Sequence, residues 1–407
     1  MRISIIGDSH CGFAWGEERG NDSLLALEES VQKSRDADLI LLTGDLFDSR
    51  LPKPEVFSAV AKILSQAQTF PNKAHLLESG AKEVSPLALR GVPVLALHGN
   101  HDRRSKHLVN PVQSLEHAGL LIHLHGSSLV FDCGGTRLGI HGMSNVPERY
   151  AKEALLTWNP KPAANSLNIL MLHQSIDPYI YSPLEPPSLK LEDVPDAFNL
   201  IVNGHLHWHD RRGLRGNVFL NTGSISPTAI HKYESEQPKC FWQWDGSALE
   251  EIPLENQRKI FLEEFELSPD MKGRIDARLG EIAGRKLSPK PIVHLKLRGI
   301  LPAGALPPNL SDVQDKWVGH FVLGVTKSLG SADFESNVEL IRALRENRLS
   351  PEESGIRLLM DNLKQARCDI RADEIFDLLV EGNTEMIFDV LTGRQKQLND
   401  MATGANL

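Results

Sequence analysis

Short polar clusters follow several apolar runs in the first half of the chain. One run, VPVLALHGNHD at residues 92–102, passes from core-like residues to Gly, Asn, His and Asp in succession. The side chains that close such runs are Asp8 and His10 in GDSH, Asp45 and Asp48 in GDLFD, Asn100, His101 and Asp102 in GNHD, His173 in MLHQ, and His205 and His207 in GHLH. Carboxylate, amide and imidazole groups without cysteine are a hard-to-borderline ligand set for divalent metals.

The spacing within these clusters supports a metal site. The Asp8-x-His10 and His205-x-His207 spacings put two side chains on one side of an extended strand end, with the middle residue turned away. A glycine before the ligands lets the backbone turn tightly. One such motif alone is weak evidence, because a lone histidine near a strand end is more often a hydrogen-bonded core residue. The five motifs together offer about seven candidate ligands. That number is too large for one metal ion and suits a pair of ions bridged by one carboxylate.

The elements that must position these clusters alternate between β and α patterns. Apolar runs typical of strands buried on both faces occupy residues 2–7, 36–44, 92–99, 136–142, 167–173 and 198–205. Helical spacing is present at residues 22–35 and 53–67, whereas 68–90 is expected to be a loop. This alternation predicts an α/β domain, in which ligands collect at the carboxyl ends of strands.

The bulk composition limits the remaining choices. The 407 residues suffice for two or three domains, and no apolar run is long enough for a membrane span. The beginning, MRISIIGDSH, has no signal-peptide pattern, so we expect a cytoplasmic protein, associated with the nucleoid if prokaryotic. Four scattered cysteines are expected to be reduced thiols. The net charge of −9 argues against an autonomous tight DNA binder, although a local patch or a partner could supply a positive field.

Taken in order, the motifs resemble those of the calcineurin-like metallophosphoesterase superfamily. Its pattern is Asp-x-His, Gly-Asp-x-x-Asp, Gly-Asn-His-Asp/Glu, His and Gly-His-x-His. Finer features resemble one branch of this superfamily, the nucleases that repair DNA double-strand breaks. This branch is the meiotic-recombination-eleven type, called SbcD in bacteria. The segments that carry the resemblance are SRLPKPEVF after GDLFD, then IHGM and MLHQSIDPYI. His123 and His125 in LIHLHG imitate a ligand pair but match nothing in this pattern, and we expect them to be strand residues.

The resemblance implies a fold and a domain organisation. Residues 1–245 would form the metallophosphoesterase β-sandwich flanked by helices, a four-layer α/β/β/α arrangement. Residues 255–330, where strand, helix and strand patterns follow one another from 259 to 299, would form a small α+β capping domain. The amphipathic helical region at 335–407 would bind an SbcC-like coiled-coil ATPase, or serve only for packing or dimerisation. A homodimer is implied through the helical segments at 54–64 and 107–120, which could instead simply cover the sheet.

The resemblance also assigns roles to individual residues. The first metal ion would be held by Asp8, His10, Asp45 and His207. The second would be held by Asn100, His173 and His205, with Asp45 bridging. His101 matches the catalytic histidine of the family and would stabilise developing charge or protonate the leaving 3′ oxygen. Asp102 would orient His101, and Asp48 would either support the ligands from behind, which we favour, or be a solvated turn residue. His141 in IHGM would be either such a neighbour or a core residue.

These roles imply a manganese-dependent DNA nuclease, an exonuclease on double strands and an endonuclease on single strands. Two divalent ions, in this family usually Mn²⁺, would activate a bridging water for in-line attack on the phosphodiester. One alternative is a two-metal phosphodiesterase or phosphatase that acts on a small or non-DNA substrate, because fold does not choose among substrates. A second alternative is a non-catalytic scaffold for the ATPase partner.

Overall fold

The structure is a computed structural model that describes most of the first 331 residues. The described ranges are 1–105, 107–180, 188–228, 230, 235–301 and 306–331, followed by 356, 359–360, 362–363, 372, 375–376, 379 and 387. The chain divides into two compact units, Met1–Lys296 with Asn309–Thr326 and Leu297–Pro308 with Lys327–Leu407. Most of the helical region predicted at 335–407 lies outside the described residues, and the predicted domain boundaries stay predictions. Within the described ranges, every helix is too short or too polar to cross a lipid bilayer.

The first sheet has six strands in the order β15-β14-β1-β2-β4-β5. They are β1 (Ile3–Ile6), β2 (Leu39–Leu42), β4 (Val94–Ala96), β5 (Ile122–His123), β14 (Cys240–Trp244) and β15 (Leu249–Pro253). The strands β1, β2, β4 and β5 are parallel, whereas β14 and β15 add an antiparallel edge. All residues of β1, β2 and β4 are buried, as their continuous apolar runs predict.

The second sheet has seven strands in the order β12-β13-β11-β8-β7-β6-β3. They are β3 (Ala74–Glu78), β6 (Ser127–Cys133), β7 (Thr136–Met143), β8 (Leu167–Leu172), β11 (Leu200–Asn203), β12 (Asp210–Leu214) and β13 (Asn217–Asn221). Its centre, β7-β8-β11-β13, is parallel, and both edges are antiparallel. Two short strands, β9 (Ile176–Asp177) and β10 (Leu189–Lys190), pair with each other, and η2 (Leu191–Asp193) follows β10.

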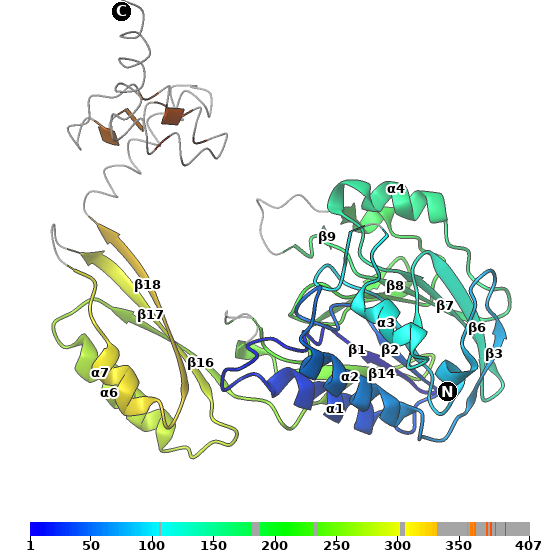
Figure 1. Ribbon diagram of the computed structural model, residues 1–407, viewed down its shortest axis with the longest axis horizontal. Coiled ribbons are helices and arrows are strands. Elements are labelled where there is room, and N and C mark those ends of the chain that lie inside the picture. The colour runs from blue at the N-terminus through cyan, green and yellow to red at the C-terminus, as the bar shows by residue number, and fades with distance from the viewer. Residues whose placement is uncertain are drawn as a thin grey trace, which may run out of the picture. The chain divides into compact units, whose positions relative to one another are not determined.

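Three apolar clusters show how these sheets and the helices pack. One cluster joins residues of both sheets, among them Ile5, Leu41, Phe131 and Ile169, so the sheets face each other across a shared core. The second joins the first sheet to α1 (Asp22–Lys33), α2 (Pro54–Ala67) and α3 (Pro111–His117), and the third joins the second sheet to α4 (Glu148–Trp158). The fold is therefore α/β, with two mixed sheets and flanking helices (Figure 1).

Most of the predicted elements are confirmed, and one is wrong. The strand runs correspond to β1, β2, β4, β7, β8 and β11, and the helical patterns to α1 and α2. Residues 68–90 are not a plain loop, because they contain β3 and the short 3₁₀ helix η1 (Pro86–Leu89). Only Ala74 of β3 is buried, so this edge strand lacks an apolar signal of its own and depends on antiparallel pairing with the distant β6.

A smaller sheet follows the two large ones in sequence. It consists of β16 (Ile260–Glu266), β17 (Ile292–Leu301) and β18 (Val322–Ser331), in that order. Helix α6 (Met271–Ala283) links β16 to β17, and α7 (Ser311–Trp317) precedes β18. The strand, helix and strand predicted between 259 and 299 are confirmed. The buried residues of α6 recur at three- and four-residue spacing, which is the stripe of an amphipathic helix.

The shared core between the two sheets predicts a large penalty for truncating Phe131. This side chain is fully buried on β6, and we expect Phe131→Ala to lower the free energy of unfolding by about 3–5 kcal/mol. Chemical denaturation followed by tryptophan fluorescence measures this, because Trp242 and Trp244 lie in the same cluster. Leu77→Ala on β3 is the control, since Leu77 is 45% exposed. Equal losses in both variants would contradict this account of the core.

Candidate metal centre

The predicted ligands gather at the carboxyl ends of strands from both sheets. Asp8 follows β1, Asp45 follows β2, and Asn100 follows β4 in the first sheet. His173 follows β8 and His205 follows β11 in the second sheet. Among the predicted site residues, three groups have potential ligand atoms within 4.8 Å of one another: Asp8, His10 and His207; His10, Asp45 and His101; and Asp45, His173 and His205. A fourth group, His209, Cys240 and Glu251, contains none of the predicted ligands. The structure thus brings together residues that are far apart in the sequence.

Asp45 lies at the centre of these groups. Its Oδ1 atom accepts a hydrogen bond from the His101 backbone N–H at 2.8 Å. Its Oδ2 atom lies 3.3 Å from His173 Nε2 and 3.9 Å from His10 Nε2. One carboxylate oxygen therefore anchors the backbone while the other faces a histidine from each side. This is the arrangement that a bridging carboxylate needs.

The first group is built around two imidazoles that face each other. His10 Nε2 and His207 Nε2 are 3.0 Å apart. His10 Nδ1 lies 3.3 Å from Asp48 Oδ1, which places its proton on Nδ1. Thr228 Oγ1 is 2.6 Å from His207 Nδ1 and can accept its proton. The two Nε2 atoms are therefore close enough to serve together as ligands of one divalent ion.

In the second group, two histidine rings face the amide oxygen of Asn100. His173 Nδ1 donates to the carbonyl oxygen of Thr43 at 2.8 Å, so its Nε2 is left to face Asn100 Oδ1 at 3.3 Å. His205 Nδ1 lies 3.0 Å from the same Asn100 oxygen. The His205 backbone N–H donates to Asp8 Oδ2 at 2.8 Å, which ties the two groups together. A backbone carbonyl behind a ligating histidine fixes its tautomer and ring orientation.

The electrostatics of the cluster favour positive charge. Burial, with Asp45 adding to it, raises the pKa of Asp8 to about 7. Burial alone would lower the pKa of His173, but the carboxylates of Asp45 and Asp8 raise it to about 9. Burial alone would raise the pKa of Asp45, but His173 and His10 hold it well below its usual range. The raised pKa values of Asp8 and His173 favour bound protons on these two groups, whereas burial lowers the pKa of His205 and His207, and the donor set of the cluster fits divalent ions.

The backbone around the ligands adopts strained conformations. His10, Asp45 and His205 all have positive φ, at 48°, 44° and 88°. Such conformations cost about 1–3 kcal/mol each in non-glycine residues and cluster at functional sites. Gly44 has φ of 112°, and a Cβ there would lie 2.3 Å from His173 Nδ1. The glycine before Asp45 is therefore required both for its backbone conformation and for the close approach of His173.

Asp102 holds two loops of the site together. Its carboxylate accepts hydrogen bonds from the backbone N–H groups of Gly99 at 3.0 Å, Leu46 at 3.1 Å and Phe47 at 2.9 Å. Burial is the largest cause that raises the pKa of Asp102 to about 6, opposed by these hydrogen bonds. Asp102 thus acts on the backbone of the turn that carries His101. Its predicted effect on the orientation of His101 would be exerted through this backbone.

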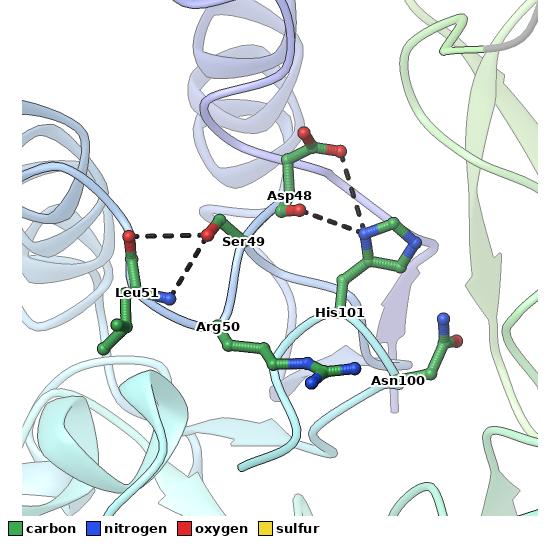
Figure 2. Close-up of a pocket in the computed structure, with 6 residues that line it drawn as sticks. All are labelled: Asp48, Ser49, Arg50, Leu51, Asn100 and His101. Atoms are coloured by element: carbon green, nitrogen blue, oxygen red, sulfur yellow. Dashed lines mark hydrogen bonds and ion pairs between the residues drawn. The ribbon is translucent and has the colours of Figure 1, made fainter. Parts of the chain in front are cut away.

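His101 faces an open pocket of about 340 Å³ beside the metal-ligand groups (Figure 2). Its Nδ1 donates to the backbone carbonyl of Asp48 at 3.0 Å, and the Asp48 carboxylate lies 3.9 Å away. Its side chain is 40% exposed, whereas the ring of His10, whose edge it meets at a centroid distance of 4.7 Å, is buried. His101 is therefore held on one side and accessible on the other, as a proton donor to a substrate must be.

His141 lies apart from the ligand groups, and two residues that support ligands had no motif in the sequence. The His141 ring on β7 contacts Ser128 Oγ at 2.8 Å and Asn168 Oδ1 at 3.0 Å, and no contact among the described residues joins it to the ligand groups. Thr228 and the Thr43 carbonyl support ligands, yet neither belongs to a recognisable motif. Only their positions in the folded chain reveal them.

The first half of the chain matches a known protein family, and several curated proteins are similar to the chain. The calcineurin-like phosphoesterase family matches residues 1–209. A DNA double-strand break repair protein Mre11 from Methanopyrus kandleri is 26% identical over 257 residues, 58% of this chain and 51% of that protein. One of the same name from Sulfolobus acidocaldarius is 24% identical over 414 residues, 96% of this chain and 94% of that protein. This chain spans only 32% of a double-strand break repair protein mus-23 from Neurospora crassa.

Solved structures also resemble the chain at a distance. A structure described as a novel archaeal phosphodiesterase is 12% identical, with a TM-score of 0.31. The match covers 62% of this chain and 100% of that one.

The raised pKa of His173 predicts that metal binding depends on pH. Below a pKa of about 9 the metal-free ring is protonated, and a ligand must lose that proton to bind a metal. We therefore expect the affinity for Mn²⁺ to rise between pH 6 and pH 8, by up to about tenfold per pH unit for each displaced proton. Isothermal titration calorimetry in buffers of different ionisation enthalpy would measure the protons released. An affinity that stays constant over this range would contradict the prediction.

The three backbone contacts of Asp102 predict that Asp102→Asn is not a neutral change. An amide group would turn a donor toward backbone N–H groups and leave at least one unsatisfied, at a cost of about 1–3 kcal/mol in the free energy of unfolding. We also expect weaker Mn²⁺ binding, because the loops that carry Asp45 and Asn100 lose their shared anchor. Denaturation and calorimetry measure the two effects, with the exposed Asp36→Asn as the control. A stability equal to that of the parent chain would refute this role.

Proposed function

The chain belongs to the calcineurin-like phosphoesterase family, and we propose that it is a manganese-dependent DNA nuclease that acts in double-strand break repair. The observation that carries the metal-dependent part is the position of Asp45. One of its oxygens lies between His10 and His173, and these two histidines belong to two separate ligand groups. This arrangement supports a pair of ions joined by one carboxylate.

The choice of DNA as substrate depends on similarity beyond the phosphoesterase match. The similarity to the Sulfolobus acidocaldarius repair protein extends over 96% of this chain, whereas the family match ends at residue 209. The extra sheet β16-β17-β18 with α6 and α7 lies in this additional part. We propose that residues 255–330 form a capping domain over DNA, since an enzyme for a small ester would not need it. We further propose that residues 1–245 are the four-layer metallophosphoesterase domain.

The proposed roles divide the site residues into two sets of ligands. The first ion would be held by Asp8, His10, Asp45 and His207. The second would be held by Asn100, His173 and His205, again with Asp45. Bound divalent ions at such a site supply Lewis-acid polarisation of phosphate oxygens and activation of water. Manganese is proposed from the family resemblance, because nitrogen and oxygen ligands also suit other divalent ions.

The protein's own groups would do the remaining work. Asp48 would keep the proton of His10 on Nδ1 and fix the His101 ring through its carbonyl. With Nδ1 of His101 held, its other nitrogen is the one available to protonate the leaving 3′ oxygen. Asp102 would keep the turn that carries His101 in register with the loop that carries Asp45.

We also propose three relations beyond the single chain. An SbcC-like coiled-coil ATPase would bind the helical region at 335–407. A second copy of the chain would pack through α2 and the segment around α3, whose inner faces already cover the first sheet. The compartment would be the cytoplasm.

The nuclease proposal is tested with two substrates and one variant. End-labelled linear duplex DNA and bis-p-nitrophenyl phosphate are incubated with the full chain, with Mn²⁺ or with chelator. We expect Mn²⁺-dependent shortening of the DNA and a loss of at least about 100-fold in Asp45→Asn, since this change removes the shared ligand. Asp36→Asn, an exposed change of the same type, should retain the activity of the parent chain.

Two outcomes would overturn the proposal in different ways. Turnover of the small ester beside intact DNA would favour a phosphodiesterase or phosphatase for small or non-DNA substrates. If neither substrate were hydrolysed although two ions were bound, a non-catalytic scaffold would be favoured.

A further inference from the structure

A second pocket of about 560 Å³ lies next to the metal centre, and its lining is cationic. Its described lining includes three guanidinium groups, two imidazoles and one phenol ring, from Arg50, Arg103, Arg104, His98, His125 and Tyr150. Neither Asp nor Glu is among the described residues that line it. Burial lowers the pKa of both histidines, so the guanidinium groups carry the positive charge, which suits the pocket to an anion.

The guanidinium groups in this pocket are not neutralised by direct contacts. Arg50 forms no hydrogen bond or ion pair with any residue that the structure describes. Arg103 donates to the amide oxygen of Asn145 at 2.7 Å, and Arg104 donates to the carbonyl oxygen of Val109 at 3.1 Å. Both acceptors are uncharged, so they orient the arginines and leave their positive charge in place. Burial lowers the pKa of Arg103, and Arg50 lowers it further, although Glu148 opposes both.

The pocket is joined to the metal centre through shared residues. Arg50 also lines the His101 pocket, and Figure 2 shows its side chain reaching toward Asn100 and His101. Asn145 donates from its backbone to the His98 carbonyl at 2.9 Å and from its side chain to the His173 carbonyl at 3.1 Å. The same amide thus positions Arg103 and contacts the backbone of a proposed metal ligand.

The floor of the pocket is rigid, and its rim carries an exposed aromatic ring. His98 Nδ1 lies 2.8 Å from His123 Nε2, and the His98 backbone N–H donates to Ser144 Oγ at 3.0 Å. His125 packs against His98 with a centroid distance of 5.3 Å. The LIHLHG segment, which matches no ligand motif, thus contributes His125 to the lining of the second pocket and His123 to the support of His98. Tyr150 on α4 is 47% exposed, and the Arg149 guanidinium lies over its ring, 4.6 Å from the centroid.

We propose that this second pocket binds a non-scissile phosphate of the substrate strand, with the attached nucleoside against Tyr150. Arginine forks match phosphate oxygens, and exposed aromatic rings stack on bases of single strands. Because Arg50 faces both pockets, a strand whose scissile phosphate is at the metal centre could place a neighbouring phosphate on the arginines. A small diester has only one phosphate and would leave the pocket empty. This inference rests on the proposed nuclease function, and it names the part of the substrate that the pocket recognises.

The test compares a substrate that reaches the pocket with one that does not. In the full chain with Mn²⁺, we expect Arg104→Gln and Tyr150→Ala each to raise KM for labelled oligothymidine by about tenfold. Both should leave kcat and KM for bis-p-nitrophenyl phosphate unchanged. The salt dependence of oligothymidine binding should lose about 0.7 in its logarithmic slope in Arg104→Gln, the amount for one phosphate contact on a single strand. Arg35→Gln, an exposed arginine outside the pocket, is the matched control.

Binding in the presence of chelator separates this proposal from the nuclease proposal. Fluorescence anisotropy of labelled oligothymidine then reports on the pocket without cleavage. Weaker binding by Arg104→Gln than by Arg35→Gln would support the pocket even if the parent chain failed to cut DNA. Equal binding by both variants would overturn it. Equal losses on oligothymidine and on the small ester would also overturn it, because they would show that the arginine only maintains the metal centre.

Discussion

The rest of the site depends on one buried carboxylate that serves two purposes. Asp45 gives one oxygen to the His101 backbone and leaves the other between His10 and His173. An ionised carboxylate at 1% exposure is costly unless it is both hydrogen-bonded and matched by positive charge. The surrounding histidines, the left-handed backbone at Asp45 and the glycine before it all follow from meeting both demands in one place.

A second buried carboxylate determines how the loops are joined. Asp102 is fully buried, and its hydrogen bonds cross from the turn after β4 to the loop after β2. The two loops belong to neighbouring parallel strands, whose carboxyl ends lie at the same edge of the sheet. The candidate metal-ligand groups and the arginine-lined second pocket therefore share one backbone framework. Asn145 extends that framework to His173 on the second sheet.

The sequence predicted the parts of this arrangement that leave a local pattern. Apolar runs located the strands, and polar endings pointed to candidate ligands that the structure brings together, such as Asp8, His10 and His207. Contacts made by backbone groups or by residues distant in sequence left no pattern. Thr228 behind His207 is one case, and β3, which is held by pairing rather than by its own burial, is another. The strained conformation of His205 also has no signal, because composition does not encode φ.

The origin of the ligands in both sheets has a consequence for the order of folding. His10 and His207 are separated by 197 residues, and their rings meet only after the two sheets have docked. Closing so long a loop is an entropic cost that local structure cannot recover early. An ion held by both His10 and His207 would therefore not organise the chain early in folding. Such an ion would stabilise the docked arrangement only after the hydrophobic core has formed it.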